Sequence, residues 1–385
     1  MSATTHAPEL GELGGRRVRG RPELYTSYRQ DQALLNTAPK RAGVTALFLA
    51  GVVLPFLVGN DMVLLLATAA AAAIGAIGLN IVTGMAGQVS LGHAFFVGVG
   101  AFTAATLAGD PDSSRHIGFG LDMLLWLPGA AVVAGAFGAL VSPLAVRLRG
   151  LYLAIVTLGL VFLGEHAFKE LKDLTGGVGV GRPGPEAVVL GVDLTEPSTL
   201  LGLTLTRHVK LYLLMLVLLA VCAVLGRNVG RSALGRAFSA VRDRDIAAAV
   251  IGVPLTKYKV LAFTISSAFA GVSGALLYTI IGHIEPSSFN LLMSIRFIAM
   301  ILIGGIATVS GAIMGAVFIT MLPRMSQFLV RELPFLSGGQ LLDQHQIEAV
   351  LYGLLIIGFL VFEPRGLFGV WLRVRNYWKG WPFSY

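Results

Sequence analysis

The sequence is short of charged residues and of cysteine. Charged residues make up 13% of its 385 residues, against about 25% in soluble globular domains, and the mean hydropathy is +0.77. These values exclude an ordinary soluble domain. The single cysteine, Cys222, excludes an intrachain disulfide and a thiolate-bound metal cluster, and we expect neither a metal nor a cofactor in this chain. The first 41 residues lack the early apolar stretch of a cleavable signal peptide.

Long apolar runs are what the sequence has instead. Hydrophobic residues make up 55% of the chain, and a transmembrane helix needs about 20 of them in succession. The uncharged run Met62–Gly109 is 48 residues long and must hold two spans, with a turn at the glycine-rich Thr83–Val89. The region Ser287–Val330 is also too long for one helix and should break at Gly304 and Gly305. We therefore predict an all-α, polytopic integral membrane protein with about ten transmembrane helices.

The placement of Lys and Arg orients these spans. An excess of both residues marks the cytoplasmic face of a bacterial inner membrane. We expect residues 42–363 to form the transmembrane domain and residues 165–210 to form its largest external loop. Because the basic residues flank apolar segments, their expected partner is membrane lipid and not nucleic acid. Of the 29 basic residues, 20 lie in four segments assigned to the cytoplasm, namely the N-terminal tail 1–41, the turn with Arg147 and Arg149, the loop 227–259 and the C-terminal tail 364–385.

The cytoplasmic segment Gly235–Lys259 has a helical period of its own. A short helix that is small and apolar on one side and charged beside it suits docking into a groove on a cytoplasmic partner. The alternative is a positively charged loop that lies on the lipid headgroups. The residues expected on the apolar face are Phe238, Val241, Ala248 and Ile251. The residues expected to stay in water are Arg242, Asp243, Arg244 and Asp245.

Uncharged polar residues gather in the segment Thr83–His93, inside the 48-residue apolar run. Non-helical backbone at membrane depth is tolerated only where it is buried in protein or lines a wet cavity. An amide or a hydroxyl can contact a zwitterionic solute without the cost of a buried charge. We expect this segment to line a substrate path or, alternatively, to pack against a neighbouring helix. The candidate path residues are Gly84, Gly87, Gln88, Ser90 and His93.

Ser90 and His93 also raise the alternative of an intramembrane serine hydrolase. Nucleophilic catalysis needs an oxyanion site and an oriented base in addition to the nucleophile. Side chains three residues apart on one helix face the same way and seldom meet in attacking geometry. We therefore expect no catalytic residue in this chain.

The energy source of transport is not evident within the chain. Gly226–Ser232 superficially resembles a phosphate-binding loop, but it is one residue short and has Arg where the Lys should be. Hydrolysis of ATP would therefore have to come from separate subunits. The spans contain almost no charged groups, which disfavours a proton-driven transporter. A passive channel remains an alternative, although it leaves the segment Gly235–Lys259 without a role.

Short motifs follow one another in order from Gly78 to Gly369. They are Gly78-Leu79-Asn80 with Gly84, Gly87-Gln88-x-Ser90-Leu91-Gly92-His93, Arg147–Gly159, Thr175-Gly176-Gly177, Gly304-Gly305 and Glu363-Pro364-Arg365-Gly366-Leu367. In this order they resemble the LivM branch of the branched-chain amino acid permeases. Asp245, followed by Ala247-Ala248-x-x-x-Gly252, is similar to the ATPase-coupling loop of ABC importer permeases, with the acid displaced by one residue.

The resemblance implies an ABC importer permease fold and a non-catalytic transmembrane subunit. Its implied partners are a homologous LivH-like permease, two cytoplasmic ATPase subunits that bind ATP and Mg, and a periplasmic or lipid-anchored solute-binding protein. The implied solutes are branched-chain or related amino acids, moved by alternating access, although relatives for urea, amides or aromatic carboxylates share these motifs. Thr157, from the third motif, joins the candidate path residues. The implied coupling residues are Gly235, Arg236, Arg242, Asp243, Asp245, Ala247, Ala248 and Gly252.

The charge asymmetry makes a topological prediction. Reporter fusions placed at Tyr385 and at Gly179 should report opposite sides of the membrane, with Tyr385 in the cytoplasm. The measurement is the activity of a reporter that works on one side only, such as alkaline phosphatase. A C terminus on the outside would contradict the ten-span topology.

Overall fold

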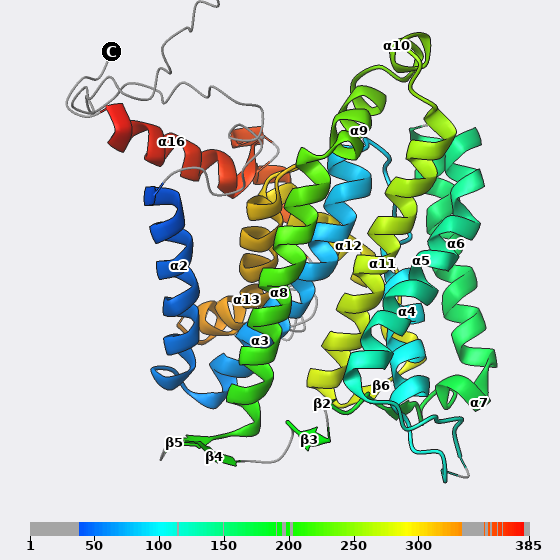
Figure 1. The fold of residues 1–385 in the computed structure, drawn as a ribbon, viewed down its shortest axis with the longest axis vertical. Helices are drawn as coiled ribbons and strands as arrows, with labels where there is room; N and C mark the ends of the chain where they lie inside the picture. The colour runs from blue at the N-terminus through cyan, green and yellow to red at the C-terminus, as the bar shows by residue number, and fades with distance from the viewer. Residues whose placement is uncertain are drawn as a thin grey trace, which may run out of the picture.

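The computed structural model is a bundle of apolar helices (Figure 1). It describes residues 38–380 except 114, 149, 190, 195–197, 201–202, 333–349, 351–352, 355, 360 and 364. Five helices of this part are long and apolar enough to cross a membrane, namely α3 (Asn60–Leu79) with its π-helical extension η2 (Asn80–Met85), α5 (Met123–Arg147), α6 (Leu151–Glu170), α8 (Arg207–Arg231) and α11 (Leu255–Ile281). Shorter apolar helices accompany them, namely α2 (Ala38–Val53), α4 (His93–Ala108) and α12 (Leu291–Gly304). Helix α13 (Val309–Glu332) contributes the shorter apolar stretch Val309–Met325. The predicted all-α class with multiple spans is confirmed.

Two predicted breaks between spans are confirmed, and one lies later than expected. The run Met62–Gly109 holds α3 and α4, but the chain leaves helical geometry only at Ala86–Gly92, because η2 continues α3 by six residues. Helix α12 ends at Gly304, and the next residue, Gly305, has a φ of +129° that favours glycine. The predicted tenth span is helical at residues 353–354, 356–359 and 361–362. Residues 1–37, Arg149 and Tyr385 lie outside the described part.

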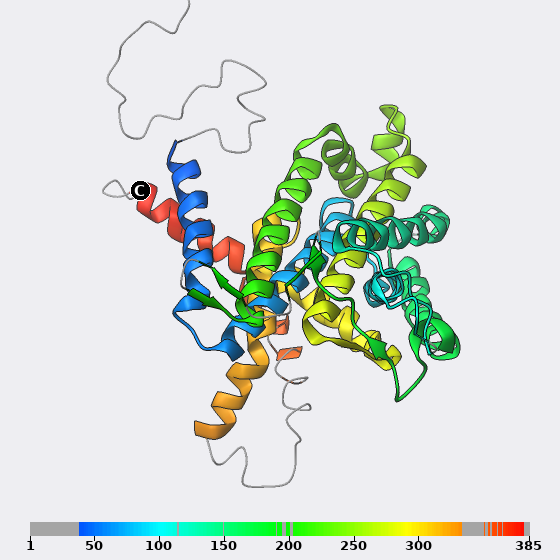
Figure 2. The same ribbon diagram turned by 60° about the horizontal axis from the view of Figure 1, so that its bottom comes forward.

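Helix α11 forms the centre of the bundle because small residues let its backbone touch its neighbours. It packs against α3, α4 and α5, and Figures 1 and 2 show α8 and α2 beyond α3 on one side and α6 beyond α5 on the other. A Cβ atom added to Gly100 of α4 would lie 2.2 Å from the backbone of Gly271, and one added to Gly274 would lie 2.0 Å from the carbonyl oxygen of Val97. Such close approach stabilises the bundle by van der Waals packing, because the hydrophobic effect does not drive helices together inside lipid.

The segments between the spans gather at two opposite ends of the bundle (Figure 1). One end, called the α10 end below, carries α9 (Ala233–Asp243), α10 (Asp245–Val250), the α5–α6 turn, the start of α2, and α16 (Gly366–Gly380). The other end, called the loop end, carries α7 (Lys172–Thr175) and short antiparallel strand pairs. These pairs are β1 (Arg182–Pro183) with β6 (His283–Ile284), β2 (Val188–Val189) with β3 (Val192–Asp193), and β4 (Ser198–Leu200) with β5 (Leu203–Leu205). Among the described residues, the loop 227–259, the α5–α6 turn and α16 thus lie at one end, and the described parts of the loop 165–210 lie at the other.

Arg182 ties the loop end to the spans. The residue is 3% exposed, and its guanidinium donates hydrogen bonds to the Thr106 hydroxyl (2.9 Å) and to the carbonyl oxygens of Leu174 (2.6 Å), Ala105 (2.6 Å) and Ile117 (3.3 Å). Burial lowers the pKa of this guanidinium to about 10, so that it stays charged at neutral pH. A single side chain thus satisfies carbonyl groups from α4, α7 and the loop before α5.

Replacing Arg182 should loosen the loop end. We expect Arg182→Met to lower the free energy of unfolding by about 2–3 kcal/mol, because hydrogen bonds from a charged donor are lost and buried carbonyl groups keep no partner. Arg182→Lys should cost less, since an ammonium retains the charge but not the planar fork. The measurement is denaturant or thermal unfolding of the purified protein in detergent. Equal stability of Arg182→Met and wild type would contradict this role.

Candidate functional site

The first part of the candidate path segment is packed against the loop between α12 and α13. Asn80, at the start of η2, is fully buried, and its side chain accepts a hydrogen bond from the Ala307 amide (2.8 Å) and donates one to the Thr308 carbonyl (2.9 Å). A Cβ atom added to Gly84 would lie 2.2 Å from the Asn80 amide oxygen and 2.6 Å from the Ala307 nitrogen. Gly84 is therefore a packing position with no room for a side chain, and it does not line an open path.

Gly87 and Arg242 bring the candidate path segment and the candidate coupling segment into contact. The Arg242 guanidinium on α9 donates a hydrogen bond to the Gly84 carbonyl (3.2 Å), across 158 positions of sequence. Gly87 has a φ of +68°, and a Cβ atom there would lie 2.5 Å from Cγ of Arg242. Two sets of residues that the sequence presented separately therefore form one site. Arg242 is exposed as predicted, but its role at this contact was not predicted.

The second part of the segment is tied to two spans by hydroxyl groups. The Leu91 amide donates to the Thr157 hydroxyl of α6 (2.9 Å), and that hydroxyl donates to the Ala154 carbonyl (3.0 Å). The Ala94 amide at the start of α4 donates to the Ser294 hydroxyl of α12 (3.0 Å). Thr157 is thus bound to backbone groups and 1% exposed, which makes it an anchor of the segment.

Ser90 and His93 lie close in sequence but bond to different groups. The Ser90 hydroxyl oxygen accepts the Gly92 amide (3.3 Å), and Ser90 is 3% exposed. The His93 ring packs edge-on against Phe297, with ring centroids 4.8 Å apart, and its Nε2 has no hydrogen-bond partner in the described part of the chain. The geometry of a nucleophile held by a base is therefore not formed by these two side chains.

The coupling segment is two helices and not one. Helix α9 starts behind Ser232, whose hydroxyl caps it by accepting the Leu234 amide, and it ends where Arg244 adopts an extended conformation (φ −154°, ψ 98°). Phe238, Val241 and Ala248 are buried as predicted. The prediction for Ile251 was wrong, because α10 ends at Val250 and Ile251 lies beyond the helix with 75% of its surface exposed.

Three apolar side chains project from α10 and its end. Ile246, Val250 and Ile251 are 70%, 83% and 75% exposed, and α10 is the outermost element of its end of the bundle (Figure 1). We call these three residues the α10 tip. The sequence analysis considered the neighbouring small residues and did not predict an exposed role for Ile246 and Val250. Their spacing of four residues was a visible signal that they share one helix face.

The other predicted coupling residues take ordinary structural positions. A Cβ atom added to Gly235 would lie 2.1 Å from the Gly230 carbonyl oxygen, so this residue closes the turn from α8 to α9. Asp243 pairs with Arg242 at 3.0 Å on the surface, and Ala247 is exposed. Gly252 has a φ of +88° with open space around it, so any side chain there would strain the backbone without touching a neighbour. The remaining member, Arg236, is exposed, and its guanidinium donates to the Arg231 carbonyl at 3.4 Å.

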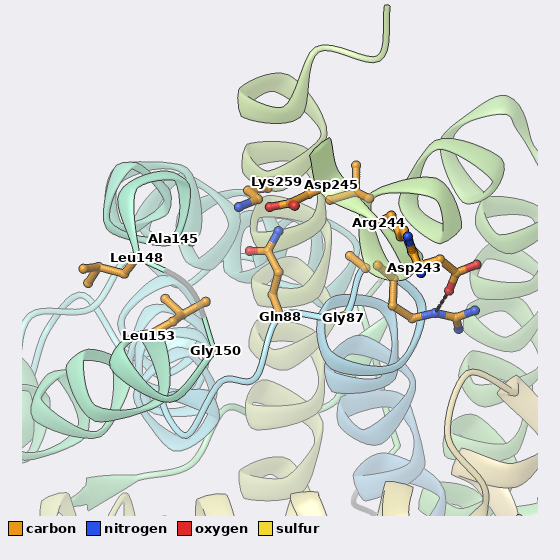
Figure 3. A pocket seen from close by; sticks show the side chains of 13 residues that line it. Gly87, Gln88, Ala145, Leu148, Gly150, Leu153, Asp243, Arg244, Asp245 and Lys259 are labelled. Carbon is orange, nitrogen blue, oxygen red and sulfur yellow. Dashed lines mark hydrogen bonds and ion pairs between the residues drawn. The ribbon is translucent and has the colours of Figure 1, made fainter. Parts of the chain in front are cut away.

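A pocket of about 210 Å³ lies between the two segments (Figure 3). Gln88 points into it from the break between η2 and α4, and its side chain is 5% exposed with neither amide atom hydrogen-bonded within the described residues. Lys259 of α11 is 6% exposed and also lines the pocket. The other lining side chains come from the ends of α5 and α6 (Ala145, Leu148 and Leu153) and from α9 and α10 (Val241, Arg242, Asp243, Arg244 and Asp245).

Comparison with known proteins places most of the chain in one family. Residues 62–360 match the family described as branched-chain amino acid transport system / permease component. The chain is 30% identical over 344 residues to the high-affinity branched-chain amino acid transport system permease protein LivM of Escherichia coli, and 29% identical to that of Salmonella typhimurium, in each case over 86% of this chain and 76% of the relative. A shorter similarity, 29% over 159 residues and about two fifths of each chain, links it to the autoinducer 2 import system permease protein LsrC of Yersinia pestis. No solved structure matches.

The contact between Gly87 and Arg242 can be tested by a double-mutant cycle. Gly87→Ala should destabilise the protein both by backbone strain of about 1–2 kcal/mol and by its clash with Arg242. In an Arg242→Ala background the clash is reduced, so the cost of Gly87→Ala should fall by at least about 0.5 kcal/mol. The measurement is thermal unfolding of all four proteins.

Gly179→Ala is the matched control for this cycle. Gly179 has a φ of +80° with nothing within 4 Å of an added Cβ, so its substitution imposes strain without a clash. Its cost should be the same with Arg242 or Ala at position 242. An equal cost of Gly87→Ala in both backgrounds would show that the two residues do not interact.

Proposed function

The chain belongs to the branched-chain amino acid transport permease family, and we propose that it forms, with a related permease, the path of an ATP-driven importer for branched-chain or related amino acids. As a family member it is a multi-pass inner-membrane permease subunit of an ABC importer. The proposed partners are a LivH-like permease, two ATPase subunits that bind ATP and Mg, and an external solute-binding protein. Solute selection would lie largely with the binding protein.

The α10 tip is the observation that carries the proposed assembly. Ile246, Val250 and Ile251 expose apolar surface at the α10 end, where the positive-inside distribution of Lys and Arg favours the cytoplasm. Exposed apolar side chains with charged neighbours fit the groove of a partner, with an apolar centre and a polar rim. In the proposed complex the tip enters an ATPase subunit and Arg242, Asp243 and Arg236 surround it.

The contacts behind the tip support a mechanical role for the segment 86–92. Arg242 of α9 packs against Gly87 of this segment and donates a hydrogen bond to the Gly84 carbonyl just before it. At its other end the segment is hydrogen-bonded to Thr157 of α6, while Ser294 of α12 binds the start of α4. In the proposed mechanism, ATP-driven closure of the ATPases displaces α10 and α9. The segment then passes that displacement to α4, α6 and α12, which alternately open the path to each side.

Substituting the α10 tip should uncouple transport from the ATPases. We expect Val250→Glu to keep the yield and thermal stability of the permease, because Val250 is 83% exposed and packs on little of the chain. The same substitution should reduce co-purification of the ATPase subunits at least tenfold, since a charge would have to be buried in an apolar groove. The measurement is the amount of ATPase retained by tagged permease after solubilisation.

Thr256→Glu is the matched control, because Thr256 is exposed at the same end and receives the same charge. It should retain the ATPase subunits at the wild-type level. Full retention by Val250→Glu would contradict docking through the tip and favour a segment that lies on lipid headgroups.

A further inference from the structure

We propose that the pocket beneath α9 and α10 is a binding site for one aliphatic α-amino acid, at the end of the permease where the imported solute is released. This inference rests on the proposed function, because it takes the transported solute as the ligand. It goes beyond that function in assigning a solute site within this chain, with named residues for the two charges and for the aliphatic side chain.

The pocket has two chemically different walls (Figure 3). The ends of α5 and α6 contribute an apolar wall formed by Ala145, Leu148 and Leu153. Opposite this wall lie the side chains of Arg244, from the link between α9 and α10, of Asp245 from α10 and of Lys259 from α11. An aliphatic amino acid has the same division, with two charged groups on one carbon and a hydrocarbon side chain. The volume of about 210 Å³ accommodates a small solute.

Gln88 lies between the two walls and lacks a partner. Both polar atoms of its amide are buried without a hydrogen bond within the described residues, although buried polar groups in folded proteins are almost always satisfied. Figure 3 shows the amide pointing toward the side chains of Lys259 and Asp245. An amide has one acceptor oxygen and two donor hydrogens, so a single Gln88 can accept from an ammonium group and donate to a carboxylate. A zwitterion supplies both.

The charges around the pocket favour a zwitterion over a simple ion. Guanidinium and ammonium groups (Arg242, Arg244 and Lys259) and carboxylates (Asp243 and Asp245) line the same space. The basic groups can face the carboxylate of a zwitterion and the carboxylates its ammonium, whereas a simple ion has only one of these two charges to offer. Lys259 and Asp245 already interact with other groups of the protein, so their contribution is the electrostatic potential inside the pocket. Gln88 contributes the hydrogen-bonding groups, because its amide oxygen and nitrogen have no partner within the described residues.

Leucine binding to the complete importer, without its solute-binding protein, tests this site. With permeases and ATPases in lipid nanodiscs, L-leucine should raise the thermal unfolding midpoint in a saturable manner. Leucinamide, which lacks the carboxylate, and 4-methylpentanoate, which lacks the ammonium, should each need at least about tenfold higher concentration. Gln88→Ala should weaken the effect of leucine by a similar factor, and Leu148→Trp should abolish it by filling the pocket.

The controls separate this site from the proposed function. Thr256→Ala, exposed at the same end and outside the pocket, should respond to leucine as wild type does. No leucine effect, or an equal effect in wild type, Gln88→Ala and Leu148→Trp, would overturn the pocket assignment. ATP-driven leucine uptake with the binding protein added is measured in parallel: uptake without pocket binding overturns the site alone, whereas absence of leucine uptake contradicts the proposed solute class.

Discussion

A backbone N–H or C=O group inside a lipid bilayer has no water with which to form a hydrogen bond. This constraint determines the contacts of the non-helical segment between η2 and α4. Between η2 and α4 the chain gives up helical hydrogen bonding for seven residues, Ala86–Gly92. The freed groups nearby are bonded by side chains of other elements, from Arg242 to the Gly84 carbonyl and from the Leu91 amide to Thr157. Glycine at position 87 lets Arg242 approach the backbone directly, and glycine at position 92 does the same for Thr157. The irregular segment is stable only because α6 and α9 hold it from both sides.

The contact with α9 links the partner-facing end of the chain to the pocket. The Gly84 carbonyl just before this segment accepts a hydrogen bond from α9, and Gly87 within the segment packs against Arg242, so the segment must respond when α9 moves. Helix α9 is joined to the exposed α10 only through the extended residue Arg244. The same segment carries Gln88, which lines the pocket together with residues of α9. A movement of α9 would therefore change the position of the Gln88 amide in the pocket. Coupling in this interpretation requires no long chain of residues, because the partner-facing element and the pocket share a wall.

Much of the fold could be predicted from the sequence, because span length and charge placement are strong constraints. The division of Met62–Gly109 and the break at Gly304 follow from the length of a helix that a bilayer accommodates. The break at Arg244 could not be predicted, since neither Gly nor Pro marks it. The contact of Gly87 with Arg242 and the bonds of Arg182 join residues far apart in sequence, and no spacing encodes such pairs. The burial predicted for the coupling segment was right for Phe238, Val241 and Ala248 and wrong for Ile251, because α10 ends at Val250.

The lone cysteine has a practical consequence for studying motion in this molecule. Cys222 lies within α8, partly buried among the spans and away from both ends of the bundle. One replacement there yields a chain without any thiol, so that every thiol introduced afterwards is a unique point of attachment for a spin label or a fluorophore. Distances between labels on α10 and on the opposite end can then be followed through an ATP cycle in an otherwise unaltered protein. The scarcity of cysteine makes this permease well suited to spectroscopy.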